Sequence, residues 1–399
     1  MKLSLIFAGA VACEGVVVGY YAPWNKLAVE DVPYKKLTHV LFSFGFLHLN
    51  GTGKFIDTDI EIKTERKDGD ISSKEKLQKM AKLGKEHGTK VLLSVGGWTG
   101  SKSFSDICAD PYKRKKFTNN AMDLIKEYGL DGIDLDWEFP GSRGNGNSFS
   151  PSDAENLLEL ATHMRRAFDK RYGNGKLLTA SVPAHPYTNS RGERMGLSGF
   201  AKAFHFVNIM GYSLMGAWSD STGPNAPLYT SAISRYSLSQ AIIEWKNTGF
   251  PANQINAGFA FFGSIQHSQG KMSNSIYASS NKEKNQPKPP AVLDCEKDAY
   301  SSDVFSYGCL RKRILASTTK ANPESGFSFN WDTASRTPWL YHPQTKLFVS
   351  FDNPRSIAAK ICLARRHKLL GVMLWDITQD HNGELIYAAT NTKCPKYKR

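Results

Sequence analysis

Three acidic side chains alternate along one short segment of the 399-residue chain, Asp131-Gly132-Ile133-Asp134-Leu135-Asp136-Trp137-Glu138. Alternate side chains of a β-strand share a face, so Asp134, Asp136 and Glu138 point one way and the apolar residues between them point the other. Carboxyl groups packed this closely cannot all ionise, so at least one pKa rises and a proton is shared. Stability alone would favour Val or Ile there. The segment therefore predicts a functional site, and acid–base catalysis is the chemistry that raised carboxyl pKa values serve.

An exposed strand or a metal site would also account for an acidic segment of this kind. The apolar residues on the opposite face argue against an exposed strand. Carboxylates suit hard cations such as Mg²⁺ or Ca²⁺, but we expect no metal and no other cofactor.

The elements that must position these carboxyl groups form a repeating pattern. Eight short apolar runs, rich in β-branched residues, predict strands at residues 15–21, 37–46, 90–95, 132–138, 177–182, 204–212, 255–262 and 369–375. Amphipathic stretches between them predict helices, the clearest at residues 74–87, 111–128 and 153–172. Strands that alternate with helices favour a parallel sheet, and eight such units favour an α/β fold, a closed (β/α)8 TIM barrel. The acidic face then looks inward, and Glu138 lies at the carboxyl end of its strand, where barrel active sites lie.

One polar stretch interrupts the pattern between the seventh and eighth strands. We expect residues 264–342 to form a small α+β insertion, and residues 13–263 and 343–394 to form the catalytic barrel. Residues 1–12 resemble a secretory signal peptide, with a basic start, an apolar run and small residues at the end. We therefore expect an extracellular protein.

Composition narrows the class of partner. Lys and Arg (51) exceed Asp and Glu (37), giving a net charge of +14, but the excess is scattered and no zinc-finger or RNA-binding pattern accompanies it. After the first residues, no apolar run reaches the roughly 18 residues of a membrane span. We expect no nucleic-acid partner, no membrane anchor and a monomer. The six cysteines permit disulfides, with Cys295 and Cys309 as the favoured pair, and Asn50 begins a glycosylation sequon.

The acidic segment resembles the signature of glycoside hydrolase family 18, the chitinase family, whose D-x-x-D-x-D-x-E motif is complete here. The resemblance extends over most of the chain. It includes Gly19-Tyr20-Tyr21 with Trp24, Ser94-Val95-Gly96-Gly97-Trp98, Met210-Gly211-Tyr212, Gly216-Ala217-Trp218, and the last helix and strand at residues 348–360 and 371–375.

The resemblance implies a retaining, substrate-assisted hydrolysis of β-1,4-linked N-acetylglucosamine. It implies that Glu138 is the general acid and base, that Asp136 orients the substrate's acetamide, and that Asp134 shares a proton with Asp136. Tyr212 would hydrogen-bond the acetamide oxygen, and Ser94 and Asp131 would support the carboxylates. The expected substrate is chitin or chito-oligosaccharides. The sugar-binding residues that the resemblance implies are Tyr20, Phe44, Gly97, Trp98, Met210, Trp218 and Trp375.

Two positions depart from the family pattern. Ser213 follows Tyr212 where the family usually has Asp, and Ser264 follows Gly263 where it usually has Arg. These departures affect the expected substrate preference, rate and pH optimum. Two alternatives stay open: a catalytically weak, lectin-like chitin-binding protein, and an endo-β-N-acetylglucosaminidase that acts on N-glycans.

Overall fold

The computed structural model describes residues 15–47, 60–62, 72–273, 275–282, 299–301 and 303–395. The predicted signal peptide, the sequon at Asn50 and the cysteine at 295 lie outside these ranges.

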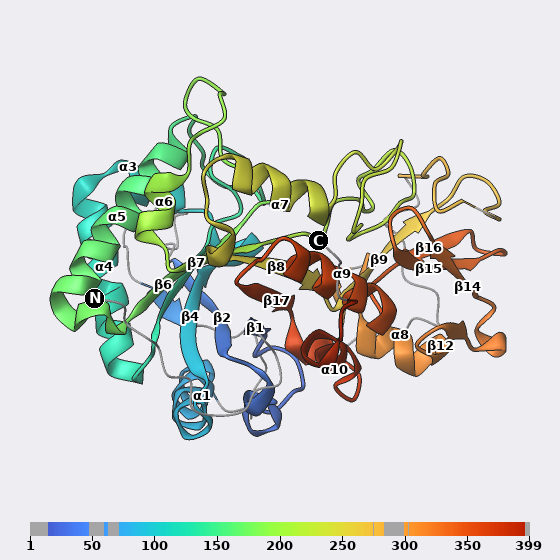
Figure 1. Ribbon diagram of the computed structural model, residues 1–399, viewed down its shortest axis with the longest axis horizontal. Coiled ribbons are helices and arrows are strands. Elements are labelled where there is room, and N and C mark those ends of the chain that lie inside the picture. The colour runs from blue at the N-terminus through green and yellow to red at the C-terminus, as the bar shows by residue number, and fades with distance from the viewer. Residues whose placement is uncertain are drawn as a thin grey trace.

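Eight parallel strands form a closed barrel, which confirms the predicted (β/α)8 fold (Figure 1). The strands are β1 (Val16–Tyr21), β2 (His39–Leu47), β4 (Lys90–Gly96), β5 (Gly132–Asp136), β6 (Leu177–Val182), β7 (Phe206–Ile209), β8 (Ile255–Ala260) and β17 (Gly371–Trp375). They pair in the order β1-β17-β8-β7-β6-β5-β4-β2, and a β1–β2 pairing closes the ring. The short strand β3 (Ile60–Ile62) adds to β2 in antiparallel fashion.

The helices follow the strands and cover the outside of the barrel (Figure 1). Their bounds are α1 (Ser73–His87), α2 (Gly97–Gly100), α3 (Phe104–Ala109), α4 (Pro111–Tyr128), α5 (Asp153–Tyr172), α6 (Ser198–Ala203), α7 (Leu238–Asn247), α9 (Pro354–Arg366) and α10 (Glu384–Asn391). Local sequence sets several of these ends. Ser72 and Glu75 form a capping box at the start of α1, and Gly88 ends that helix in the left-handed conformation. Among the described helices, none is long and apolar enough to cross a bilayer.

The strand alternation predicted for the acidic segment places its apolar residues in the layer between barrel and helices. Ile133, Leu135 and Trp137 are buried in one large cluster with the helix side chains. The Trp137 ring stacks on Phe104 of α3 with 5.3 Å between ring centroids. A second, smaller cluster fills the inside of the barrel and includes Tyr20, Met210, Tyr212 and Met373. The acidic face of β5 therefore looks into a packed interior.

An antiparallel sheet is inserted between β8 and β17, at the right of Figure 1. Its strands pair in the order β10-β11-β9-β16-β15-β14. They are β9 (Phe262–His267), β10 (Ala299–Ser301), β11 (Val304–Ser306), β14 (Ser328–Asp332), β15 (Thr337–His342) and β16 (Leu347–Ser350). The same segment also contains the helix α8 (Tyr307–Arg313) and a hairpin formed by β12 (Leu315–Ser317) and β13 (Lys320–Ala321). The sheet begins at Phe262 and ends at Ser350, so it extends past both expected limits of the insertion, residues 264 and 342. The limits of the subdomain itself stay a prediction.

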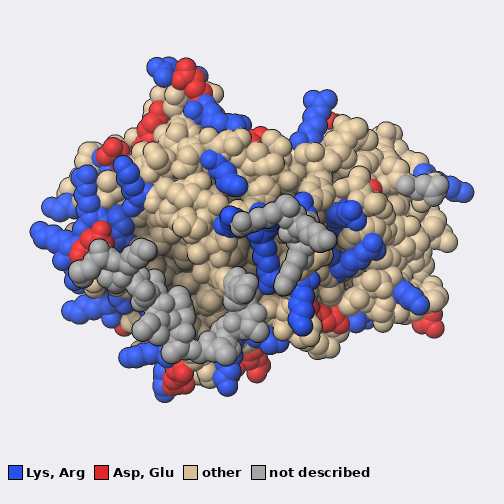
Figure 2. All heavy atoms as spheres, in the orientation of Figure 1, with Lys and Arg blue, Asp and Glu red and all other residues tan. Residues whose placement is uncertain are grey.

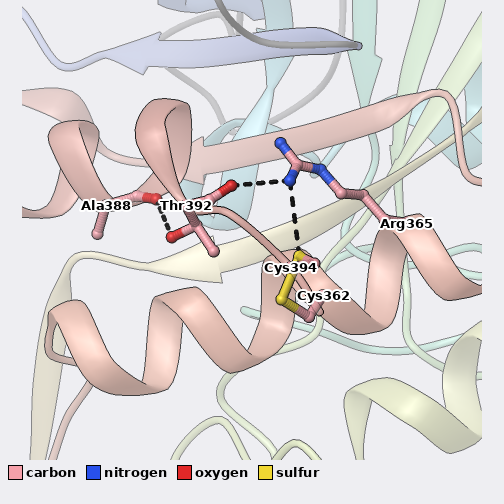
Figure 3. Close-up of a disulfide and its surroundings, with 5 residues drawn as sticks. All are labelled: Cys362, Arg365, Ala388, Thr392 and Cys394. Atoms are coloured by element: carbon pink, nitrogen blue, oxygen red, sulfur yellow. Dashed lines mark hydrogen bonds between the residues drawn. A yellow bond between two sulfur atoms is a disulfide. The ribbon is translucent and has the colours of Figure 1, made fainter. Parts of the chain in front are cut away.

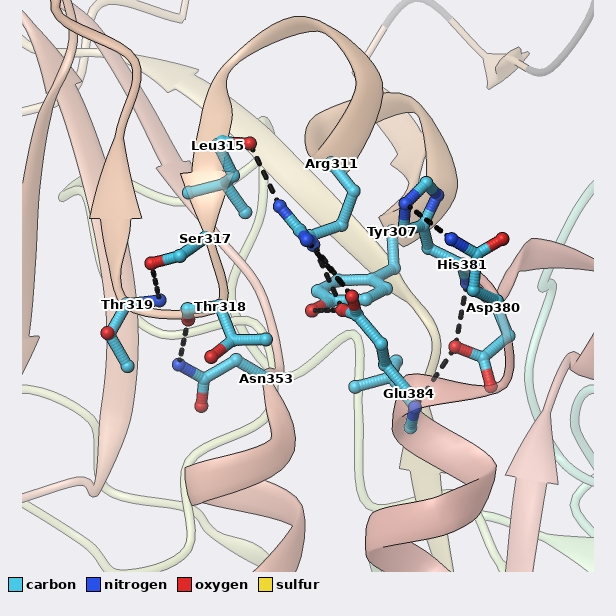
Figure 4. A network of polar contacts seen from close by, with 12 residues as sticks. Tyr307, Arg311, Leu315, Ser317, Thr318, Thr319, Asn353, Asp380, His381 and Glu384 are labelled. Atoms are coloured by element: carbon cyan, nitrogen blue, oxygen red, sulfur yellow. Dashed lines mark hydrogen bonds and ion pairs between the residues drawn. The ribbon is translucent and has the colours of Figure 1, made fainter.

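A charged contact ties the insertion to the last helix of the barrel (Figure 4). Arg311 of α8 donates to both carboxylate oxygens of Glu384 at the start of α10, with Nε 2.9 Å from Oε2 and Nη2 3.0 Å from Oε1. The Tyr307 hydroxyl donates to the same Oε2 at 2.7 Å. Such two-point contacts fix orientation as well as distance. The Glu384 carboxylate is thus one of the contacts that hold the insertion to the barrel.

A disulfide joins α9 to the segment that follows α10 (Figure 3). Cys362 and Cys394 have Cα atoms 5.4 Å apart, and Arg365 donates to the Thr392 carbonyl oxygen at 2.7 Å beside them. Cys309 is also disulfide-bonded, but its predicted partner, Cys295, lies outside the described residues. Cys108 is a buried free thiol.

Replacing Cys362 and Cys394 together by Ala should lower the free energy of unfolding by about 3–4 kcal/mol, because the bond closes a loop of 32 residues in the unfolded chain. Chemical denaturation measures this change. Reduction of the wild-type protein should cause a larger loss, because it also breaks the disulfide of Cys309, and the reduced double variant and the reduced wild type should be about equally stable. Equal stability of the two oxidised proteins would contradict the expectation.

Candidate active site

Asp134 lies at the centre of a hydrogen-bonded cage inside the barrel. Its Oδ2 accepts from the Tyr20 hydroxyl at 2.7 Å and from Ser94 Oγ at 2.8 Å, and its Oδ1 accepts from Thr179 Oγ1 at 2.6 Å. Burial raises the pKa of Asp134, and the three hydroxyl donors oppose that rise. Since both oxygens accept hydrogen bonds, the ionised form is well satisfied.

Asp136 and Glu138 lie in a more demanding environment. Burial raises the pKa of Asp136 well above its ordinary value, and the charges of Glu138 and Asp134 raise it further. Asp136 Oδ1 has no hydrogen-bond partner among the described residues. Burial also raises the pKa of Glu138, to about 7. The carboxyl column, as we call Asp134, Asp136 and Glu138, therefore holds protons near neutral pH, as the strand pattern predicted.

The backbone around Glu138 is fixed by side chains from two loops. Its N–H donates to Ser101 Oγ at 3.0 Å, and the Ser101 hydroxyl lies 3.1 Å from the Asp136 carbonyl oxygen. Asn147 Nδ2 donates to the Glu138 carbonyl oxygen at 2.7 Å. Strand β5 ends at Asp136, so these contacts, rather than the sheet, position the acid.

A glycine permits the close approach of two strands at this point. Gly96 pairs with Asp136, and its φ of 114° is one that residues with side chains rarely adopt. A Cβ atom at Gly96 would lie 2.2 Å from the Asp136 carbonyl oxygen. Any side chain there would displace the strand that carries the carboxyl groups.

Aromatic rings from three strand ends line the region beside the carboxyl groups. The Trp375 ring meets Tyr20 edge-on at 5.3 Å and stacks on Phe44 at 5.6 Å, and Phe44 stacks on Trp24 at 6.0 Å. A Cβ at Gly97 would lie 2.6 Å from the Phe44 ring. The structure therefore brings together Tyr20, Phe44 and Trp375, all predicted to bind sugar.

Tyr212 and Met210 lie in the apolar cluster inside the barrel. Burial raises the pKa of Tyr212 well above its ordinary value, and the charges of Asp136 and Glu138 add to the rise, so the phenol stays a proton donor. The next residue, Ser213, is exposed and adopts a φ of 54°. Its N–H donates to Asn225 Oδ1 at 3.0 Å.

Two tryptophans predicted to bind sugar are exposed, Trp98 at 51% and Trp218 at 58%. The connection that carries Trp218 is held by Gln266 of β9. Gln266 Nε2 donates to the carbonyl oxygens of Gly216 (2.7 Å) and Ser221 (3.0 Å). Its Oε1 accepts from the Gly223 N–H at 3.0 Å. This buried amide fixes the loop around an exposed ring.

Asp131 lies at the opposite end of β5 from Glu138. Its Oδ2 accepts from the Val91 N–H at 2.9 Å, and its Oδ1 pairs with Lys90 at 3.0 Å. Both contacts join β4 to β5 at the end of the barrel away from the acid. Asp131 therefore serves the pairing of these strands.

Four residues of the site were not predicted from the sequence: Thr179, Ser181, Ser101 and Asn147. Thr179 and Ser181 pair with Asp134 and Asp136 across β5 and β6. The Ser181 hydroxyl lies 2.5 Å from that of Tyr20. Thr179 and Ser181 alternate along the otherwise apolar strand β6. This pattern could have indicated that both side chains face the inside of the barrel. Within the described residues, no group of three or more His, Cys, Asp or Glu side chains is arranged to hold a metal ion.

The closed barrel is the fold of a glycoside hydrolase, and the carboxyl column is its candidate active site. Residues 16–380 match the family Glycosyl hydrolases family 18, and the chain belongs to that family. It is 27% identical over 380 residues to an endochitinase of Manduca sexta, covering 91% of this chain and 63% of that protein. It is 28% identical over 395 residues to a chitinase-like effector of Moniliophthora perniciosa, covering 94% of this chain and 86% of that protein.

Solved structures show the same architecture. A chitinase from Rhizomucor miehei superposes with a TM-score of 0.80 at 26% identity, covering 94% of this chain and 99% of that chain. A class V chitinase from Nicotiana tobaccum gives a TM-score of 0.78 at 22% identity, covering 95% and 99%, and this second likeness concerns the fold alone.

The raised pKa of Glu138 makes stability depend on pH. The folded state binds this proton more tightly than the unfolded state, so stability conferred by protonated Glu138 is lost as pH rises from about 4.5 to about 7. Denaturation across this range should show the free energy of unfolding falling by up to about 3 kcal/mol. In Glu138→Gln the slope should shrink. An unchanged slope in that variant would show that Glu138 titrates normally.

Proposed function

We propose that the chain is a chitinase that hydrolyses β-1,4 linkages of N-acetylglucosamine polymers by a retaining, substrate-assisted mechanism. The observation that carries the proposal is the carboxyl column, in which Asp134 and Asp136 are buried, Glu138 is half-buried, and the pKa of Glu138 is raised to about 7. Membership of the family and the likeness to the Rhizomucor chitinase support it.

The first step needs a proton donor. Glu138 gives its proton to the glycosidic oxygen as the bond to the anomeric carbon breaks. At the same time, the carbonyl oxygen of the substrate's own acetamide attacks that carbon, and an oxazolinium intermediate forms. A pKa of about 7 keeps the acid protonated below neutrality while leaving it able to release the proton.

Asp136 and Tyr212 hold the acetamide during this step. Asp136 Oδ1, which has no partner among the described residues, is suited to accept the acetamide N–H and to stabilise the positive charge that develops. Asp136 shares a proton with the neighbouring Asp134, so that Asp136 carries negative charge when the positive charge on the substrate develops. The Tyr212 hydroxyl donates to the acetamide oxygen and keeps it in line for attack.

The second step restores the enzyme. Ionised Glu138 takes a proton from water, and the resulting hydroxide attacks the anomeric carbon from the face that the leaving group left. The bond to the acetamide oxygen breaks, so the acetamide is regenerated and configuration is retained. Glu138 is protonated again at the end of the cycle.

The aromatic residues give the sugar chain its binding surface. The stacked rings of Phe44 and Trp375 are suited to form the floor below the reacting sugar, and the exposed rings of Trp98 and Trp218 offer faces for neighbouring sugars. We further propose that the protein is secreted and acts as a monomer on chitin or chito-oligosaccharides. The apolar N-terminal run supports secretion.

A lectin-like protein that binds chitin with little turnover is the second candidate. Ser213 at a position usually held by Asp favours it, as does the likeness to a chitinase-like effector. An endo-β-N-acetylglucosaminidase shares the carboxyl pattern. Release of glycans from a glycoprotein, compared with cleavage of chito-oligosaccharides, separates it from a chitinase.

Glu138→Gln should lower turnover of chito-oligosaccharides by about a hundredfold to ten-thousandfold, because the amide cannot give up a proton, while sugar binding is kept. A time course with products resolved by length and anomer measures this, and the wild type should release β-anomers. Glu159→Gln, an exposed substitution on α5, is the matched control. Binding without cleavage by the wild type would establish the lectin-like candidate.

Ser213→Asp should move the alkaline limb of the kcat/KM profile above its wild-type position near pH 7. A new negative charge beside Tyr212 disfavours ionisation of Glu138, and Asp tolerates the left-handed backbone at this position. Ser213→Asn has nearly the same shape without the charge and should leave the limb in place. If both variants shift the limb equally, the charge has no part in the effect.

A further inference from the structure

A second pocket lies where helix α9, the β14–β15 hairpin and the connection before α7 meet, and its volume is about 220 Å³. Three arginines line it, Arg336, Arg355 and Arg366, together with the rings of Tyr229 and Trp331. None of the described residues that line it is acidic. We call it the arginine pocket, and the proposed mechanism does not use it.

Two of the arginines are spread along one wall. Arg355 and Arg366 lie on the same face of α9, eleven residues apart, which corresponds to about 16 Å along the helix axis. Arg336 comes from the facing hairpin, so the pocket presents basic side chains from two different elements to a single ligand.

Arg355 occupies a position that helix stability disfavours. It is the second residue of α9, where the helix dipole is positive and an acidic side chain is favoured by about 0.3–1 kcal/mol. Its guanidinium lies over the Trp331 ring, 3.9 Å from the ring centroid. Stacking of this kind fixes the plane of the guanidinium and leaves its edge for an anion.

Arg336 occupies a position that the backbone disfavours. Its φ is 57°, in the left-handed region where a residue with a side chain costs about 1–2 kcal/mol relative to the usual conformation. Glycine would fit better there. The stacking on Trp331 offsets the helix-dipole cost at Arg355, whereas nothing described in the hairpin offsets the backbone cost at Arg336, which points to a use for its charge in the pocket.

The walls of the pocket are held in place by contacts outside it. The Ser335 N–H donates to Asp332 Oδ2 at 2.7 Å within the hairpin turn, and the Leu228 N–H donates to the Ser335 carbonyl oxygen at 2.9 Å. The Cys362–Cys394 disulfide holds the end of α9 (Figure 3). A ligand would therefore meet a largely preformed surface.

We propose that the arginine pocket binds an acidic polysaccharide, a glycan chain that carries carboxylate or sulfate groups. Guanidinium groups match such oxyanions with paired hydrogen bonds, and the Tyr229 ring offers a face to a sugar. Nucleic acid fits less well, because single strands are held by successive rings that stack on bases, and of the two aromatic residues that line the pocket Trp331 is already covered by Arg355.

General charge must be separated from the pocket itself. Figure 2 shows that basic side chains are spread over the visible face and gather at its left, over α4 and α5. Lys115 and Lys126 of α4 are exposed. The pair Lys115→Ala and Lys126→Ala therefore removes the same net charge as a pocket pair and serves as its control.

The test measures binding of polygalacturonate and of dextran sulfate to the full chain by titration calorimetry at physiological salt, with neutral dextran beside them. Arg336→Gly combined with Arg355→Ala should weaken binding about tenfold or more, since charged hydrogen bonds are lost. The lysine pair should change it about twofold or less. The polymer that binds more tightly identifies carboxylate or sulfate as the preferred group. Chito-oligosaccharide cleavage should be the same in all three proteins.

Arg336→Gly removes a disfavoured backbone conformation, but Arg355→Ala removes the contact with Trp331, so the Tm of both pairs is measured and binding is compared well below it. Equal loss of binding in both pairs would overturn the proposal in favour of general charge attraction. No binding of either acidic polymer by the wild type would also overturn it. Duplex DNA that binds more tightly than both polymers, and is released by the arginine pair alone, would show a nucleic-acid site instead.

Discussion

The placement of three carboxyl groups inside one barrel, two of them buried and the third half-buried, is the constraint on which this structure depends. An ionised carboxylate far from water is very costly unless it is hydrogen-bonded or protonated. The barrel uses both solutions. Asp134 receives three hydroxyl donors from strands β1, β4 and β6, whereas Asp136 and Glu138 have pKa values raised by burial. One strand therefore carries a satisfied anion next to groups that hold protons.

The hydrogen bonds to Asp134 restrict which residues the neighbouring strands can carry. Ser94 and Thr179 pair with Asp134 from the two sides of β5, so the register of three strands must be correct for the cage to form. A slip by one residue would turn the hydroxyls outward. Gly96, beside Asp136, lets β4 and β5 approach. The pairing of the strands, the placement of the hydroxyl groups and the proton affinity of the carboxyl groups therefore depend on one another. For this reason polar residues occur in strands that are otherwise apolar.

The sequence was informative where the pattern is local. Helices α4 and α5 have the bounds that periodicity predicted, and α1 begins one residue earlier. The spacing of Asp134, Asp136 and Glu138 was enough to place them on one face. Thr179 was missed because its role depends on which strands become neighbours. Asn147 was missed because its contact depends on the path of a loop, which no periodicity reports.

The same limit applies to residues that meet only through tertiary structure. Trp331 and Arg355 come from a hairpin and a helix, and nothing in the intervening sequence indicates that a ring and a guanidinium will stack. For Asp131 the sequence did give a signal, but the signal did not indicate the position of the residue in the fold. It belongs to the family motif, yet it lies at the far end of the strand and secures β4. A motif can thus combine chemical and architectural positions.

The amide of Gln266 has a mechanical consequence. It belongs to β9 of the inserted sheet, while the loop it holds carries Trp218. Trp98, by contrast, follows directly from barrel strand β4. Both rings therefore belong to connections of the barrel, but only the loop of Trp218 is held by the insertion. The distance between the two rings thus depends on how the insertion packs against the barrel, and a polymer bound to both rings would favour one such packing.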